Sequence, residues 1–186
     1  MKKFLLIAVG LFFVGSANAT LITSNTTNIT TTQQSFSTVV NLLDTYENIF
    51  LNVTAKGDYG ATQSEEFLKL YIDGVELLNW CAGSNSSTSC PNVGVTSVTE
   101  NSSAIDYTII GGFAISDLLW SAFSSDSILN ISWNNGRGVN NSSTGGSDFV
   151  TYSITGDVVE ASSPAVISLF VLALAGFGFT RRNKNK

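Results

Sequence analysis

Four runs of this 186-residue chain alternate apolar and polar residues with a period of two. A period of two places successive side chains on opposite faces of a β-strand, whereas an α-helix repeats every 3.6 residues. Each run therefore predicts a strand with one apolar, inward-facing side. The inward-facing sets are Ile49, Leu51, Val53 and Ala55; Leu68, Leu70 and Ile72; Leu129, Ile131 and Trp133; and Val150, Tyr152 and Ile154.

Clusters of Gly, Asn, Asp and Ser separate these runs and predict tight turns. The pair Asp73-Gly74 stands between two apolar runs, which is typical of a β-hairpin. Residues 116–126 have helical spacing instead, with Ser116 as the N-cap. About eight short strands and one helical turn predict an all-β fold, an antiparallel β-sandwich of jelly-roll type, over residues 36–160.

The stretch before this domain, residues 20–35, is rich in Thr and Asn and carries hardly any charge. It lacks an apolar face that a core could bury, so we expect a loose leader that enters a first strand near residues 36–43. Gly57-Asp58-Tyr59, the Asp73-Gly74 turn and the later pair Cys81 and Cys90 lie within residues 48–159, and this segment resembles a β-sandwich pattern common in exported bacterial surface proteins. That resemblance implies the fold and no particular activity.

The N-terminal residues 1–19 have the three parts of a secretory signal peptide. Lys2 and Lys3 precede an apolar stretch of about a dozen residues, which is too short to span a bilayer. Ala17 and Ala19 form the small-x-small cleavage site. We therefore expect cleavage after Ala19 and export of the remaining chain.

The C-terminal segment, residues 162–186, joins an uncharged run at 165–179 to a basic end. As a helix the run would cover about 22 Å, against about 30 Å for the hydrocarbon core of a bilayer. Its cations, Arg181 and Arg182 among them, predict a cytoplasmic C-terminus with the sandwich outside. The segment is interpreted as a transmembrane helix, either a sorting tag that is later removed or a permanent anchor.

Three features of this segment occur in a fixed order: Ser163-Pro164, the apolar LFVLALAGFGF, and RRNKNK. Together they resemble the PEP-CTERM sorting domain, with Ser-Ser-Pro where Pro-Glu-Pro is usual. The resemblance implies a Gram-negative bacterium with exopolysaccharide genes and an exosortase-type enzyme that cuts near the motif. It also implies a transient stay in the inner membrane, with Arg181 and Arg182 as retention signals, followed by release to the cell envelope or the extracellular space.

The two cysteines, Cys81 and Cys90, flank a Ser/Asn-rich loop, and in an exported chain such a pair predicts a disulfide. Between residues 20 and 160 the sequence has 14 acidic and three basic residues, a net charge of −11. Phosphate groups would be repelled by such a surface, which excludes nucleic acid as a partner.

The chain has no histidine, which excludes catalysis by a nucleophile and a histidine base, and it has no phosphate-binding glycine loop. Carboxylate pairs are the catalytic chemistry left open. Four acidic residues could supply such a pair for a small secreted carbohydrate-active hydrolase. They are Asp58, Glu65, Glu66 and Asp73.

Two ligand types remain candidates. Carboxylates in a loop on a rigid sandwich could hold calcium, and Asp58 and Glu66 are the proposed ligands; no other cofactor is indicated. Tyr59 and Trp80 stand beside predicted loops and are candidates for an exposed pair that stacks against a sugar. The remaining tryptophans, Trp120 and Trp133, are expected in the core.

These observations favour a non-enzymatic protein of the cell surface or extracellular matrix. Its expected role is structural or polysaccharide-binding, with an exosortase-type enzyme and exopolysaccharide as expected partners.

Overall fold

The structure is a computed structural model that describes residues 19–60, 65–82, 90–102, 106–139 and 147–159. The described residues form nine strands and one helix. These are β1 (Thr20–Asn28), β2 (Ser35–Asn41), β3 (Tyr46–Gly57), β4 (Leu68–Ile72), β5 (Val75–Trp80), β6 (Val95–Ser102), β7 (Asp106–Ala114), α1 (Asp117–Phe123), β8 (Ile128–Asn135) and β9 (Phe149–Val158).

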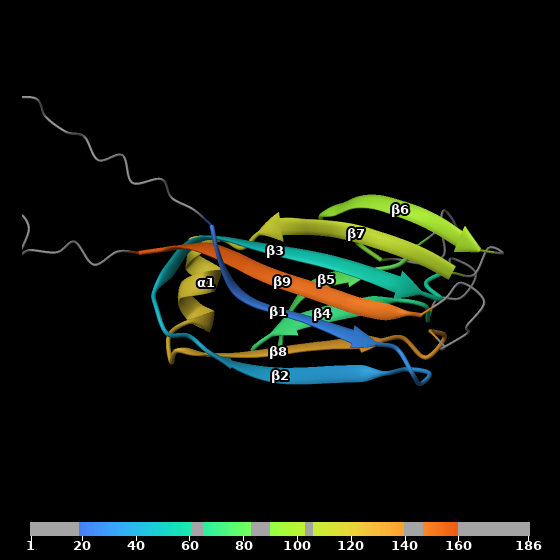
Figure 1. The fold of residues 1–186 in the computed structure, drawn as a ribbon, viewed down its shortest axis with the longest axis horizontal. Coiled ribbons are helices and arrows are strands. Elements are labelled where there is room, and N and C mark those ends of the chain that lie inside the picture. The colour runs from blue at the N-terminus through green and yellow to red at the C-terminus, as the bar shows by residue number, and fades with distance from the viewer. Residues whose placement is uncertain (1–18, 61–64, 83–89, 103–105, 140–146, 160–186) are drawn as a thin grey trace, which may run out of the picture.

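The strands form two antiparallel sheets packed face to face, so the prediction of an antiparallel β-sandwich is confirmed (Figure 1). The five-stranded sheet has the order β1-β9-β3-β7-β6, and the four-stranded sheet has the order β2-β8-β4-β5. Consecutive strands therefore often lie in different sheets. This arrangement gathers the loops at the two ends of the sandwich.

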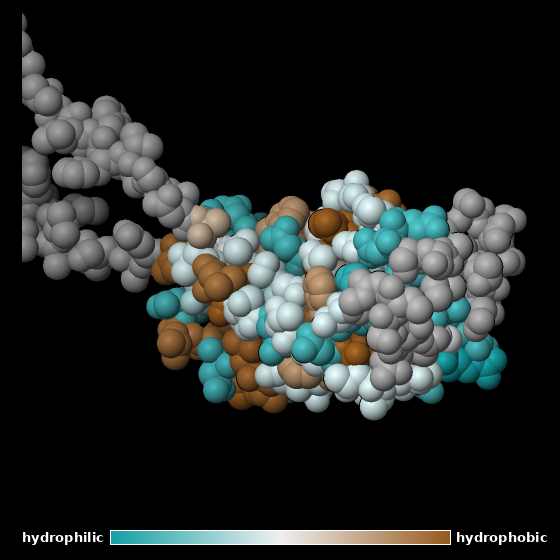
Figure 2. Space-filling view, turned by 45° about the vertical axis from the view of Figure 1, so that its right-hand side comes forward, coloured by the Kyte–Doolittle hydropathy of each residue, from teal (hydrophilic) through white to brown (hydrophobic). Residues whose placement is uncertain are grey.

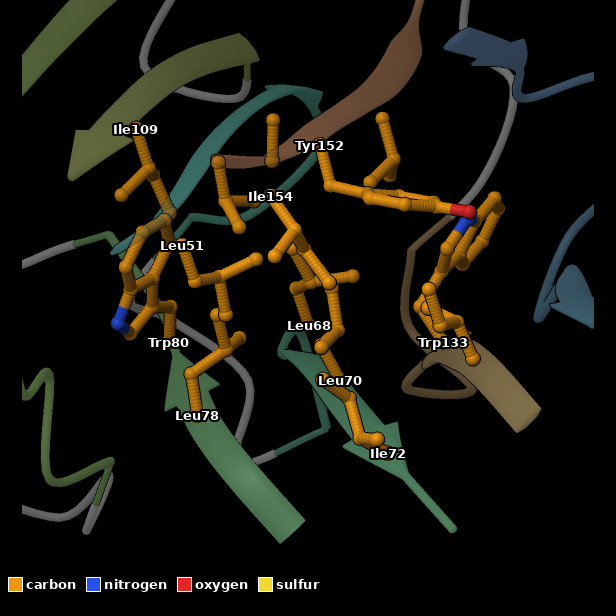
Figure 3. Packing of buried hydrophobic residues seen from close by; sticks show 14 of the residues in the cluster. Leu51, Leu68, Leu70, Ile72, Leu78, Trp80, Ile109, Trp133, Tyr152 and Ile154 are labelled. Atoms are coloured by element: carbon orange, nitrogen blue, oxygen red, sulfur yellow. The ribbon is translucent and has the colours of Figure 1, made fainter. Parts of the chain in front are cut away.

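The core lies between the sheets and consists of the apolar sets that the alternation predicts. Burial alternates along β4 and β9, and the inward positions are almost completely excluded from solvent. Figure 3 shows Leu51 of β3 meeting Trp80 and Leu78 of β5, so the two sheets share one core. Full burial of each large side chain contributes about 1.5–3 kcal/mol.

The expected loose leader is wrong for its first part, because Thr20–Asn28 forms strand β1. β1 is an edge strand that pairs with β9, and the hydroxyls of Thr26 and Thr151 are hydrogen-bonded across the pair at 2.9 Å. An edge strand exposes one face and one side to water, so polar residues suffice to form it. The sandwich domain consequently begins at Thr20 rather than at residue 36.

Two local predictions are confirmed. Asp73 and Gly74 form the tight turn between β4 and β5, with φ values of 49° and 78°, which is the left-handed region that glycine adopts most easily. Helix α1 begins after Ser116, whose side chain accepts a hydrogen bond from the Leu119 amide at 3.4 Å. The helix buries Trp120 and Phe123 against one end of the core.

Cys81 and Cys90 form the predicted disulfide, with their Cα atoms 5.9 Å apart. Cys81 directly follows β5, and its amide donates to the Asn92 side chain at 2.9 Å. The bridge therefore ties the end of β5 to the segment that leads into β6.

Replacing Cys81 and Cys90 together by serine is expected to lower the free energy of unfolding by about 2–3 kcal/mol, because the unfolded chain gains loop freedom. Urea denaturation of the double variant measures the loss. Reduced wild-type protein serves as the control and should match it. Equal midpoints for oxidised wild type and the double variant would contradict this role of the bridge.

The start of β1 and the end of β9 lie at the same end of the sandwich, since Thr20 pairs with Gly156 (Figure 1). Apolar side chains gather at this end of the surface (Figure 2). Exposed residues include Leu43 in the loop after β2, Leu118 in α1 and Val159 after β9. No helix among the described residues is long and apolar enough to cross a membrane, and residues 160–186 lie outside them.

Candidate functional site

Four acidic side chains lie at the end of the sandwich opposite the start of β1 (Figure 1, right). Asp58 directly follows β3, Glu66 precedes β4, Asp106 begins β7 and Asp148 precedes β9. Three of these strands are neighbours in the five-stranded sheet and the fourth belongs to the other sheet. We refer to Asp58, Glu66, Asp106 and Asp148 as the acidic end.

All four carboxyl groups of the acidic end are buried, with exposed fractions of 6% for Asp58, 3% for Glu66, 0% for Asp106 and 3% for Asp148. Several of their oxygens have no hydrogen-bond partner: Oε2 of Glu66, both oxygens of Asp106 and Oδ1 of Asp148. A buried charge normally requires a partner, because water no longer solvates it. The acidic end thus combines four buried carboxyl groups with four carboxyl oxygens that have no hydrogen-bond partner.

The pKa values of two of these groups reflect this environment. Burial raises the pKa of Glu66 to about 7, and the negative charge of Asp58 adds to the effect. Burial also raises the pKa of Asp148 to about 6, and the charges of Asp106 and Asp58 raise it further while Lys56 opposes them. The four carboxyl groups therefore act on one another electrostatically.

Tyr59 and Trp80 are both fully buried, so the prediction that they form an exposed sugar-stacking pair is wrong. Tyr59 donates a hydrogen bond to the Asn135 side chain at 2.9 Å, and burial raises its pKa far above the ordinary value. Trp80 donates from Nε1 to the Val93 carbonyl at 2.7 Å. Both rings are part of the core, although both residues stand next to loops in the sequence. Their burial could not be predicted from the neighbouring residues. Trp120 and Trp133 are buried as predicted.

The end of β8 lies tightly against the segment that carries Glu66. Gly136 donates to the Phe67 carbonyl at 2.8 Å, and a Cβ on Gly136 would overlap the Glu65 backbone. Arg137 forms an ion pair with Glu65. Glycine thus permits the close approach that fixes the backbone on either side of Glu66.

Asp58 and Glu66, the proposed calcium ligands, both belong to the acidic end, and the charge of Asp58 acts on Glu66. Within the described ranges, no three His, Cys, Asp or Glu side chains lie close enough together to hold a metal ion by themselves. Any ion at this end would need amide, backbone or water oxygens in addition to carboxylates.

A second feature, which the sequence reasoning missed, is the outer face of the four-stranded sheet. Strand register places polar side chains in two rows across all four strands. We call them together the polar face. The first row is Ser35, Asn134, Lys69 and Asn79, and the second is Ser37, Ser132, Tyr71 and Glu76.

A hollow of about 390 Å³ lies beside the second row of the polar face. Its lining residues are Ser37, Thr38, Val39, Gly74, Asn130, Ile131 and Ser132. Oδ1 of Asp73 accepts from the Asn130 backbone amide at 2.9 Å and from its side-chain amide at 2.8 Å. The turn between β4 and β5 therefore orients one wall of the hollow.

The chemistry of the polar face is that of a neutral hydrogen-bonding surface. Its two charged groups, Lys69 and Glu76, neutralise each other in an ion pair at 2.9 Å. Asn79 and Asn134 flank Lys69 in the first row, and the Oδ1 atom of each is buried without a hydrogen-bond partner. Tyr71 adds a half-buried aromatic ring beside them. The polar face could have been predicted from the alternate polar residues in β8 and β4. These side chains must face away from the core, because the apolar residues between them face into it.

Comparison of the chain with protein-family models, curated proteins and solved structures finds no match. Ala19 is exposed just before β1, whereas Ala17, Ser163, Pro164, Arg181 and Arg182 lie outside the described residues. The predicted signal cleavage and the sorting motif stay predictions.

Proposed function

We propose that this chain is an exported, non-enzymatic β-sandwich of the cell surface or extracellular matrix, which binds a neutral polysaccharide across the polar face. The observation that carries the proposal is the pair of polar rows across four strands, with Tyr71 in the second row and a hollow beside that row. Amide and hydroxyl groups match sugar hydroxyls, and an aromatic ring can pack against the apolar side of a pyranose.

Other features support the remaining parts of the proposal. The Cys81–Cys90 disulfide agrees with an oxidising environment outside the cytoplasm. The strand orders 1-9-3-7-6 and 2-8-4-5 support a jelly-roll interpretation with β6 as an additional edge strand. Sorting by a PEP-CTERM-like segment, with an exosortase-type enzyme as partner, rests on residues 162–186 of the sequence.

The hydrolase alternative requires carboxyl groups that a sugar can reach. Asp58 and Glu66 are nearly excluded from solvent, Glu65 forms an ion pair with Arg137, and Asp73 is engaged with Asn130. These positions favour binding over hydrolysis, and we do not propose an enzymatic activity.

Replacing Tyr71 by alanine is expected to weaken binding of a neutral polysaccharide by about 10-fold, equivalent to about 1.4 kcal/mol, because a central contact on the polar face is lost. Affinity electrophoresis in gels containing neutral glucans, galactans or mannans measures the effect. Thr54→Ala, on the outer face of the five-stranded sheet, is the matched control and should bind as wild type does. Equal loss in both variants, or retention by none of these polymers, would contradict the proposal.

A further inference from the structure

The acidic end holds four carboxyl groups in a part of the sequence that has few cations. The sequence has three cations between residues 20 and 160. Lys69 pairs with Glu76 on the polar face, and Arg137 pairs with Glu65. Lys56, the third, donates to the Ser147 carbonyl at 3.4 Å and acts on Asp148. These three cations are fewer than the four carboxyl groups of the acidic end, and two of the three form ion pairs with other residues.

The unpartnered oxygens at the acidic end provide an independent sign of a missing ligand. Asp106 is completely buried and neither of its oxygens has a hydrogen-bond partner, and Oε2 of Glu66 is in the same condition. Native proteins pair buried polar atoms in the great majority of cases, and buried carboxylates pair with cations or coordinate metals.

We propose that the acidic end binds one calcium ion, with Asp58 and Glu66 as carboxylate ligands and with amide, backbone carbonyl and water oxygens completing its shell. The site is separate from the polar face and is independent of polysaccharide binding. Glu66 precedes β4 in one sheet and Asp58 follows β3 in the other, so the ion joins the two sheets at their loop-bearing end.

Calcium fits this site better than other divalent ions. The available ligands are oxygens, and calcium accepts six to eight of them in flexible geometry, whereas zinc prefers nitrogen and sulfur. Because no three carboxylates converge within the described ranges, neutral oxygens must supply the rest of the shell. Such sites in extracellular modules bind calcium with Kd values of about 0.1–1 mM.

The test uses the purified full-length protein, stripped with a chelator and titrated with calcium chloride. Isothermal titration calorimetry should show one binding event, and calcium at about 100 times Kd should raise the thermal unfolding midpoint by roughly 5–10 °C. Absence of both heat and a midpoint shift at about 10 mM calcium, well above the range for extracellular modules, would overturn the proposal.

Three single variants locate the ion. Glu66→Gln and Asp58→Asn keep size and remove one charge each, and each is expected to weaken calcium binding at least about 10-fold. Asp44→Asn removes an equivalent charge from the exposed loop at the opposite end and should respond to calcium as wild type does. Unchanged calcium affinity in Glu66→Gln would overturn the assignment of Glu66 as a ligand. If a variant fails to fold, the wild-type titration still tests whether the protein binds calcium.

Discussion

Trp80→Ala is expected to lower the free energy of unfolding by about 3–5 kcal/mol, the range for removing a large aromatic side chain from a core. Trp80 is fully buried between the sheets, where it meets Leu51 and Leu78 (Figure 3). Its loss would leave a cavity and would also deprive the Val93 carbonyl of the indole hydrogen bond. Urea denaturation followed by circular dichroism measures the change.

Two variants serve as controls for this prediction. Trp80→Phe keeps most of the ring volume and should cost less than Trp80→Ala, with unchanged polysaccharide affinity, because Trp80 is a core residue. Leu118→Ala truncates a side chain that is 86% exposed, so its effect should stay within about 0.5 kcal/mol. A loss below about 1 kcal/mol for Trp80→Ala would show that this side chain is not packed in the core.

The second large effect concerns pH. In chelator, the free energy of unfolding is expected to decrease by about 3 kcal/mol as the pH rises from about 4.5 to above 7, because the pKa of Glu66 rises from 4.5 to about 7 on folding. A carboxyl group whose pKa is raised by folding binds more protons in the folded state. Its contribution is therefore most favourable below the unfolded pKa and is lost as the pH passes through the folded value.

Urea denaturation at several pH values measures this dependence. Glu66→Gln cannot ionise at this position, so the variant should show a flatter profile and should be more stable than wild type at about pH 8 without calcium. Asp44→Asn, the charge-matched control, should retain the wild-type profile. A wild-type stability that increases between about pH 5 and pH 8 would contradict the uncompensated acidic end.

The inward faces of the strands could be predicted because a period of two is a local property. Leu68, Leu70 and Ile72 are all buried, and the same rule places Lys69 and Tyr71 on the outer face. The hairpin at Asp73-Gly74 and the cap at Ser116 also depend on nearest neighbours alone. These predictions needed no knowledge of how the strands pair.

The errors concern positions whose environment is set by distant parts of the chain. Tyr59 and Trp80 adjoin turns in the sequence, but the opposite sheet covers both. The polar strand β1 has no apolar pattern of its own and is held by its ladder with β9, more than a hundred residues away. Polar residues can form an edge strand once a partner strand supplies the hydrogen bonds.

The acidic end combines a feature that neighbouring residues determine with features that distant parts of the chain determine. Asp58 and Glu66 are close in the sequence and could be identified as one group, although their burial could not. Asp106 and Asp148 join them because β7 and β9 flank β3 in the five-stranded sheet. The same register effect creates the polar face, since Asn134 and Ser132 acquire neighbours on β2 and β4 when the sheet forms.

Backbone amide chemical-shift mapping tests the central claim most directly. An isotope-labelled sample of the protein is titrated with a neutral oligosaccharide from a polymer that retards it in the gel assay. Polysaccharide binding across the polar face predicts that the largest shift changes occur at Tyr71, Asn130, Ser132 and Asn134, with little change on the outer face of the five-stranded sheet. Changes confined to β1, β3 and β9 would contradict the proposed binding surface.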